Sequence, residues 1–262
     1  GALPQTPQGT LSLDPARGNF PLDPFRAIEL VSLPQFFRVL LFFPFPLPNF
    51  SPKEVFSPMI AILDYGMGNL RSVQKALEFL AIPCFITDTP SALSTADHII
   101  LPGVGAFSDA MTRIRALHLD RAILSAADAG IPILGICLGM QMLFQHSEEN
   151  GFYDGLGLFP GTITKFRDAG LKIPHMGWNT LDTRPCVLFD GGQSPFVYFV
   201  HSYCMANVSP EWTTATCTYG QTFTAAIQRG NVMATQFHPE KSGEVGLNML
   251  RRFAQWKGDK SC

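Results

Sequence analysis

Cys137 is the residue of this 262-residue chain whose setting most clearly favours chemistry. Residues 133–136 are short, branched and apolar and predict a buried strand, whereas residues 140–144 predict a helix. Gly135 and Gly139 flank the cysteine, and glycine permits the cramped backbone of a strand-to-helix corner. Such a corner presents the sulfur above a helix N-terminus, where the helix dipole and free N–H groups favour a thiolate. The alternative is a small buried core cysteine, the commoner fate of a lone cysteine.

A cysteine nucleophile needs a base, and the base needs a group that orients it. His238 directly follows a predicted strand, and Pro239 biases it to an extended conformation, so that Glu240 two residues on can lie beside the imidazole. Parallel strands end at one edge of a sheet, where Cys137 also emerges. A polar surface loop is the alternative, but together with the elbow a Cys-His-Glu triad is the better interpretation. Three other histidines fit structural or solvated positions better: His98, His118 and His146.

Acyl transfer also requires hydrogen-bond donors for the developing oxyanion. The backbone N–H of Leu138, the residue after the nucleophile, is positioned by the elbow itself. A second donor could come from residues 102–105, at the carboxyl end of another predicted strand, where the amides of Val104 and Gly105 can turn toward the site.

The composition is that of a globular protein of one or at most two domains rather than of a nucleic-acid-binding protein. The chain is 46% hydrophobic and 15% charged, with a formal net charge of −2, so it can bury a substantial core and offers no basic surface. The six cysteines lie far apart and no histidine pair has metal-ligand spacing, so no disulfide framework, metal site or cofactor is expected. A reducing, cytoplasmic compartment is the simplest interpretation.

Residues 1–58 differ from the rest of the chain. They are rich in proline and phenylalanine, and the proline spacing breaks any helical or strand period. We expect an irregular or disordered extension, with the working protein beginning at Met59 and one domain over residues 59–262. The apolar residues 39–43 are too short to span a bilayer. They are also too far from the start to be a secretory signal, and no small-residue cleavage site follows them. No membrane association is therefore expected.

From Met59 onward, strands alternate with helices. This alternation predicts an α/β fold with a mostly parallel central sheet, helices on both faces and added antiparallel strands. We expect Asn69 to cap the first helix. The expected helices are 70–80, 107–117, 119–129, 140–144 and 243–256. The expected strands are 59–65, 84–87, 98–101 and 133–136, then 162–166, 196–201, 213–218, 222–228 and 232–237 as the antiparallel extension.

Six stretches together resemble a known family: 64–69, 102–107, 135–141, 175–179, 198–203 and 238–240. The elbow and the His-Pro-Glu stretch are similar to those of the triad (class I) glutamine amidotransferases. The full set resembles the glutaminase subunits of imidazole glycerol phosphate synthase, from Met59 to about Trp256. The resemblance implies the flavodoxin-like fold of class I amidotransferases. It also implies hydrolysis of L-glutamine and transfer of ammonia to a (β/α)8-barrel cyclase subunit, in a heterodimer that serves histidine biosynthesis.

The resemblance also implies residue roles. Cys137 would be the nucleophile, His238 the general base and then acid, and Glu240 its orienter. Residues 175–179 would face the cyclase, with Met176, Trp178 and Asn179 in contact. The implied glutamine-binding residues are Gly103, Gln141, Glu149, His201, Ser202 and Tyr203. Without the resemblance, Gln141 is an exposed helix position, Glu149 a surface acid and Trp178 a buried residue in a tight glycine turn.

Other functions remain open from the sequence. The same chemistry could serve anthranilate, aminodeoxychorismate or pyridoxal phosphate synthesis, but those families carry different glycine loops and lack the stretch 175–179. A non-catalytic scaffold would be expected to have lost a triad member, and none is missing. A cysteine peptidase or esterase would have no role for Gln141.

Overall fold

The computed structural model describes residues 58–258 apart from 168–169 and 206–207. The extension predicted for residues 1–58 therefore lies outside the described residues except for Pro58. Within the described part, no helix is both long and apolar enough to cross a bilayer.

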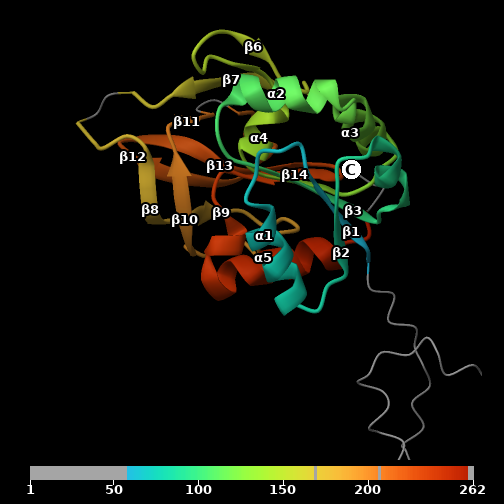
Figure 1. Ribbon diagram of the computed structural model, residues 1–262. Coiled ribbons are helices and arrows are strands. Elements are labelled where there is room, and N and C mark those ends of the chain that lie inside the picture. The colour runs from blue at the N-terminus through green and yellow to red at the C-terminus, as the bar shows by residue number, and fades with distance from the viewer. Residues whose placement is uncertain (1–57, 168–169, 206–207, 259–262) are drawn as a thin grey trace, which may run out of the picture. The chain divides into compact units, whose positions relative to one another are not determined.

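An eight-stranded mixed sheet forms the centre of the fold (Figure 1). Five parallel strands stand side by side in the order β2 (Cys84–Thr87), β1 (Ile60–Leu63), β3 (His98–Gly103), β4 (Ile133–Cys137) and β14 (Val232–Thr235). Three antiparallel strands extend it: β13 (Gln221–Arg229), β12 (Thr213–Tyr219) and β9 (Asp182–Thr183). The predicted architecture is confirmed, because buried runs of branched residues form the parallel strands and connecting helices cover them.

Helices cover both faces of this sheet (Figure 1). On one face lie α1 (Leu70–Phe79) and α5 (Gly243–Gln255), and on the other lie α2 (Phe107–Ala116), α3 (Leu119–Asp128) and α4 (Leu138–Met142). Alternate residues of β1 enter two separate apolar clusters: Ile60 and Ile62 pack with α1 and α5, and Ala61 and Leu63 with α2 and α3. Short 3-10 helices span Pro90–Thr95 and Pro239–Lys241.

The second half of the chain forms two smaller sheets that the sequence pattern did not separate. Strands β8 (His175–Thr180) and β10 (Phe196–His201) pair antiparallel. The other sheet contains β11 (Tyr203–Cys204), β7 (Phe159–Lys165), β5 (Phe144–Ser147) and β6 (Tyr153–Asp154). Assigning the strands predicted at 162–166 and 196–201 to the central sheet was therefore wrong. The strand predicted at 232–237 as antiparallel is also a correction, because β14 pairs parallel with β4. A local apolar pattern does not specify which distant strand becomes the partner.

Three local expectations also differ from the structure. The helix after the elbow begins at Leu138 and ends at Met142, so Phe144 belongs to β5. Residues 175–180 form a strand rather than a tight turn, and its Trp178 is exposed. The side chain of Asn69 does not cap α1, because its Oδ1 accepts a hydrogen bond from Ser72 Oγ at 2.8 Å.

Helix α4 lies directly against β3 at Gly139. A Cβ atom at this position would lie 1.8 Å from the carbonyl oxygen of Leu101, far inside van der Waals contact. Glycine is therefore required for the elbow helix to pack this closely on the neighbouring strand.

We predict that Gly139→Ala lowers the free energy of unfolding by about 3 kcal/mol or more, because the clash is with backbone that cannot move aside. Gly130→Ala is the control: Gly130 has φ +80° but open space around it, so that substitution should cost only about 1 kcal/mol of backbone strain. Urea unfolding of both variants measures the difference, and equal losses would contradict the close-packing argument.

Candidate active site

Cys137 sits at the strained corner between β4 and α4. Its backbone has φ 56° and ψ −107°, a combination that non-glycine residues rarely adopt. A Cβ atom on Gly135 would lie 3.0 Å from the Gly139 carbonyl group, so both glycines allow the corner to close. This strand-to-helix turn is the geometry of a nucleophile elbow, and its strain of about 1–3 kcal/mol is held by the surrounding packing.

His238 and Glu240 form a buried pair at the end of the neighbouring parallel strand. His238 Nδ1 lies 2.8 Å from Glu240 Oε1, and the two side chains are only 2% and 1% exposed. His238 is extended, with φ −101° and ψ 98°. The carboxylate accepts the Nδ1–H hydrogen bond, which leaves Nε2 as the nitrogen available for proton transfer.

The backbone of His238 is held by residues that the sequence interpretation did not identify. Its N–H donates to the carbonyl of Tyr198 at 3.0 Å, and Ser242 Oγ donates to its carbonyl at 2.7 Å. Ser242 Oγ in turn accepts the N–H of Tyr198 at 3.0 Å. Strand β10 therefore fixes the position of the imidazole.

The pKa of His238 is raised. Burial alone would lower it, but the neighbouring Cys137 sulfur and the Glu240 carboxylate outweigh burial and raise the pKa to about 10. Nε2 has no hydrogen-bond partner among the described residues, and Cys137 is the neighbour that contributes most to raising the pKa. The pair is therefore suited to holding a proton on the histidine beside the sulfur.

The Cys137 sulfur has two further polar neighbours. It lies 3.9 Å from the carbonyl oxygen of Val200, and Gln236 Nε2 lies 3.7 Å from it as a donor. Neither residue was predicted from the sequence, because each depends on a strand that packs beside the elbow only in the folded chain.

A pocket of about 340 Å³ opens above the sulfur. It brings together nine of the predicted site residues: Val104, Gly105, Cys137, Leu138, Gln141, Glu149, His201, Ser202 and Tyr203. Pro174 and Val200 complete the lining and were not predicted. The volume is in the range expected of a small-molecule site.

Gln141 and Glu149 each make hydrogen bonds to other residues of the chain. Gln141 is 5% exposed, contrary to an exposed helix position, and its Nε2 donates to Tyr203 O and Gln236 Oε1, both at 3.1 Å. Its Oε1 therefore remains the acceptor for a ligand. Glu149 Oε2 accepts the N–H of Phe107, at the start of α2, from 2.8 Å. Burial raises the pKa of this carboxyl group against the lowering effect of that hydrogen bond.

The end of β3 lies beside the elbow. Gly103 is in parallel register with Cys137, which places the following amides of Val104 and Gly105 at the pocket. Gly103 itself does not line the pocket: a Cβ atom there would lie 2.5 Å from the Tyr65 hydroxyl oxygen. That hydroxyl donates to the carbonyl of Pro102 at 2.8 Å, and burial raises its pKa. Tyr65 thus anchors this strand end, a role that no local sequence signal indicated.

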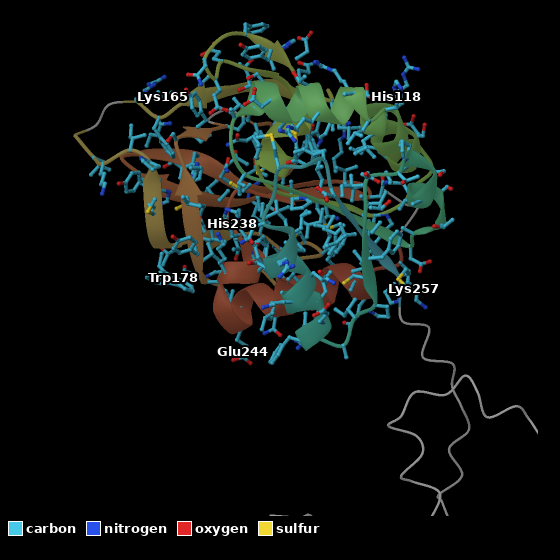
Figure 2. The ribbon with its side chains drawn as sticks, viewed as in Figure 1. His118, Lys165, Trp178, His238, Glu244 and Lys257 are labelled. Carbon is cyan, nitrogen blue, oxygen red and sulfur yellow. The ribbon has the colours of Figure 1, made fainter. Side chains whose placement is uncertain are left out.

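The two-stranded sheet β8–β10 carries an exposed apolar patch. Met176, Trp178 and Phe196 are 60%, 53% and 56% exposed. Trp178 lies at the periphery beside these strands, whereas His238 lies in the interior (Figure 2). Asn179, predicted with Met176 and Trp178 to face the partner, is half-buried on the opposite side of β8 from these two side chains, and its Nδ2 donates to Thr218 O at 3.1 Å. Its contact with a partner stays a prediction.

We predict that Cys137→Ala lowers the pKa of His238, because the sulfur is a partner that raises it. A folded-state pKa above 6.5 means that protonated His238 stabilises the fold fully below pH 6.5, and this contribution is lost as the pH rises toward about 10. Removing the sulfur should narrow the pH range over which protonated His238 stabilises the fold. NMR titration of the imidazole measures the pKa, with His98 as the unchanged reference. An identical His238 pKa in both proteins would contradict the pairing.

Comparisons with known proteins agree with this geometry. The family model described as glutamine amidotransferase class-I matches residues 61–256. A relative from Thermosynechococcus vestitus, named imidazole glycerol phosphate synthase subunit HisH, is 52% identical over 202 residues, covering 75% of this chain and 96% of the relative. One from Oceanobacillus iheyensis with the same name is 49% identical over 199 residues, covering 75% and 98%.

Solved structures show the same fold at lower identity. A crystal structure described as glutamine amidotransferase superimposes with a TM-score of 0.60 at 18% identity, covering 74% of this chain and 98% of that one. PurLQS from Thermotoga maritima gives 0.59 at 21% identity, covering 75% and 97%. Since the family model spans nearly all described residues and the relatives match over almost their whole length, the chain belongs to the class-I glutamine amidotransferases and, within them, to the family of imidazole glycerol phosphate synthase HisH subunits.

Proposed function

We propose that this chain hydrolyses the side-chain amide of L-glutamine through a Cys137 thioester and supplies the ammonia to a cyclase subunit that makes imidazole glycerol phosphate. The observation that carries the proposal is the buried His238–Glu240 pair at 2.8 Å beside a cysteine on a nucleophile elbow. We assign this activity to one domain, residues 59–262, and expect it in the reducing cytoplasm. Unpaired thiols at all five cysteines of the described residues support that compartment.

In the first half of the reaction, the Cys137 sulfur attacks the amide carbon of glutamine and the carbonyl π electrons move to oxygen. The N–H of Leu138 and an amide from Val104 or Gly105 stabilise this oxyanion. As the tetrahedral intermediate collapses, the C–N bond breaks and His238 Nε2 gives its proton to the leaving nitrogen. Ammonia leaves and a thioester remains.

In the second half, His238 Nε2 accepts a proton from water as the water oxygen attacks the thioester carbon. Collapse breaks the C–S bond, releases glutamate and restores the sulfur. Glu240 accepts the Nδ1–H hydrogen bond throughout and stabilises the imidazolium, because its carboxylate is 2.8 Å away and buried.

Glutamine recognition is assigned to the polar lining of the pocket. Gln141 Oε1 can accept from the substrate ammonium group, and Glu149 adds a carboxyl group at the same rim. His201, Ser202 and Tyr203 form a further part of the lining. A non-catalytic scaffold is disfavoured because every member of the triad and an open pocket are present together.

We propose the patch formed by Met176, Trp178 and Phe196 as the contact surface for the (β/α)8-barrel cyclase. Large exposed apolar side chains gathered on one small sheet are typical of a protein interface, and aromatic residues often carry most of the binding energy. A synthase for anthranilate, aminodeoxychorismate or pyridoxal phosphate is the alternative partner, and failure of the cyclase to bind would favour it.

We predict that Cys137→Ala lowers glutamine-dependent synthesis by the complex by at least about a thousandfold, because no thioester can form. Synthesis from added ammonia should stay within about twofold of wild type, because the partner's chemistry is untouched. Cys217→Ala, a buried cysteine in β12, is the matched control and should retain both activities. Persistent glutamine-dependent turnover in the Cys137 variant would refute the nucleophile assignment.

We also predict that Trp178→Ala weakens binding of the cyclase by about 10- to 100-fold, the usual loss at a central aromatic contact. Phe79→Ala on α1 removes a side chain that is 78% exposed but lies outside the patch, and it should leave the affinity unchanged. Titration calorimetry with the purified cyclase subunit measures both, and equal affinities for all three proteins would place the interface elsewhere.

A further inference from the structure

Two neighbouring buried histidines, of which His201 lines the pocket, have no role in the reaction described above. His175 on β8 and His201 on β10 stand directly opposite each other in the antiparallel register. His175 Nδ1 lies 3.2 Å from His201 Nε2, and both side chains are buried.

Aromatic rings enclose this pair. The His175 ring stacks between Phe199, with centroids 4.7 Å apart, and Tyr219, at 4.1 Å. His201 lies 5.1 Å from Phe166 and 5.2 Å from Phe223. A charged imidazole is disfavoured in such surroundings. Burial, the largest cause in each case, lowers the pKa of His175 to about 4 and that of His201 to about 3.

One carbonyl group determines the direction of every hydrogen bond in the pair. His201 Nδ1 lies 2.9 Å from the carbonyl oxygen of Tyr203, which can only accept, so Nδ1 carries the proton. In a neutral ring Nε2 is then an acceptor, and His175 Nδ1 must donate to it. His175 Nε2 is an acceptor in turn, and Asn179 Nδ2 donates to it at 3.4 Å.

The same carbonyl joins the pair to the pocket. Tyr203 O also accepts from Gln141 Nε2 at 3.1 Å, and the second hydrogen of that amide goes to Gln236 Oε1. Gln236 Nε2 then donates toward the Cys137 sulfur at 3.7 Å. A continuous run of hydrogen bonds therefore leads from Asn179 on β8 to the sulfur, with Gln141 in its middle.

We propose that His175 and His201 are a positioning pair that holds the Tyr203 carbonyl and, through it, the Gln141 amide in the orientation that binds glutamine. The proposal rests on the proposed glutaminase function. Both ring nitrogens of His201 are occupied by the protein, so the ring acts through Tyr203 and Gln141 rather than by donating to the substrate. If Gln141 lost its fixed acceptor partner, its amide could rotate and turn Oε1 away from the pocket.

The test compares two substitutions at one position in the full-length chain. His201→Leu removes the donor to Tyr203 O and should raise KM for glutamine by about 5- to 50-fold, with kcat within about threefold. His201→Asn places an amide N–H near the position of Nδ1 and should hold KM within about threefold of wild type. Glutaminase assays measure both constants in the presence of the cyclase subunit.

A matched control separates positioning from stability. His98 is also buried, at the opposite end of β3 from Gly103: its Nε2 donates to Trp256 O at 2.7 Å and its ring packs edge-on against Phe253. His98→Leu should lower the melting temperature and leave KM unchanged. If it raised KM as much as His201→Leu, the effect would be one of general stability and the proposal would fail.

Labelling of Cys137 supplies a readout that does not depend on turnover. A diazoketone analogue of glutamine must occupy the pocket before it alkylates the sulfur, whereas iodoacetamide need not. His201→Leu should slow the first reaction by about the same factor as the change in KM and leave the second unchanged. Equal slowing of both reactions, or a fall in kcat with KM unaltered, would overturn the proposal.

Two further outcomes are distinguishable. A wild-type chain that neither hydrolyses glutamine nor reacts with the diazoketone would refute the proposed function itself. If His201→Leu does not fold, His175→Phe keeps the stack between Phe199 and Tyr219 while removing the donor to His201. It should raise KM by about 3- to 10-fold, and an unchanged KM in that folded variant would refute the positioning pair.

Discussion

The close approach of α4 to β3 is the constraint on which the site depends. Because Gly139 has no Cβ, the helix lies against the carbonyl of Leu101, and Cys137 must turn sharply through φ 56° to connect β4 with that helix. The turn directs the sulfur toward the carboxyl edge of the sheet. A bulkier residue at 139 would push the helix outward and separate the sulfur from its partners.

Parallel pairing of β4 with β14 brings His238, the proposed base, to the elbow. Ile136 lies opposite Thr235, so the two strands end together and place Cys137 and His238 at one edge. Burial would by itself favour a neutral imidazole, but the nearby sulfur and the carboxylate of Glu240 outweigh it. His175 and His201 show the opposite balance: among the described residues no carboxylate raises their pKa, burial dominates, and they stay neutral. Similar burial therefore has different results at the two sites. His238 holds a proton, whereas His175 and His201 stay neutral and hydrogen-bond to each other.

The two small sheets give the pocket its walls. Strand β10 contributes Val200 and His201, and its partner β8 carries the exposed Met176 and Trp178 on one side and the buried His175 on the other. One strand therefore carries both exposed apolar side chains and a buried histidine. Period-two alternation makes this possible, because neighbouring residues face opposite sides.

The sequence by itself predicted the strands of the parallel core, the elbow at Cys137 and the pairing of His238 with Glu240, because each is indicated by residues close together: branched runs, two glycines around Cys137, and His-Pro-Glu after a strand. Only the tertiary structure decided that β7 and β10 leave the central sheet, that Asn179 turns inward, and that Tyr65, Val200 and Gln236 surround the reactive groups. These features are contacts between segments up to about a hundred residues apart, since Gln236 and Cys137 are separated by 99 positions. Such contacts arise from strand pairing and packing, which leave no local pattern to read.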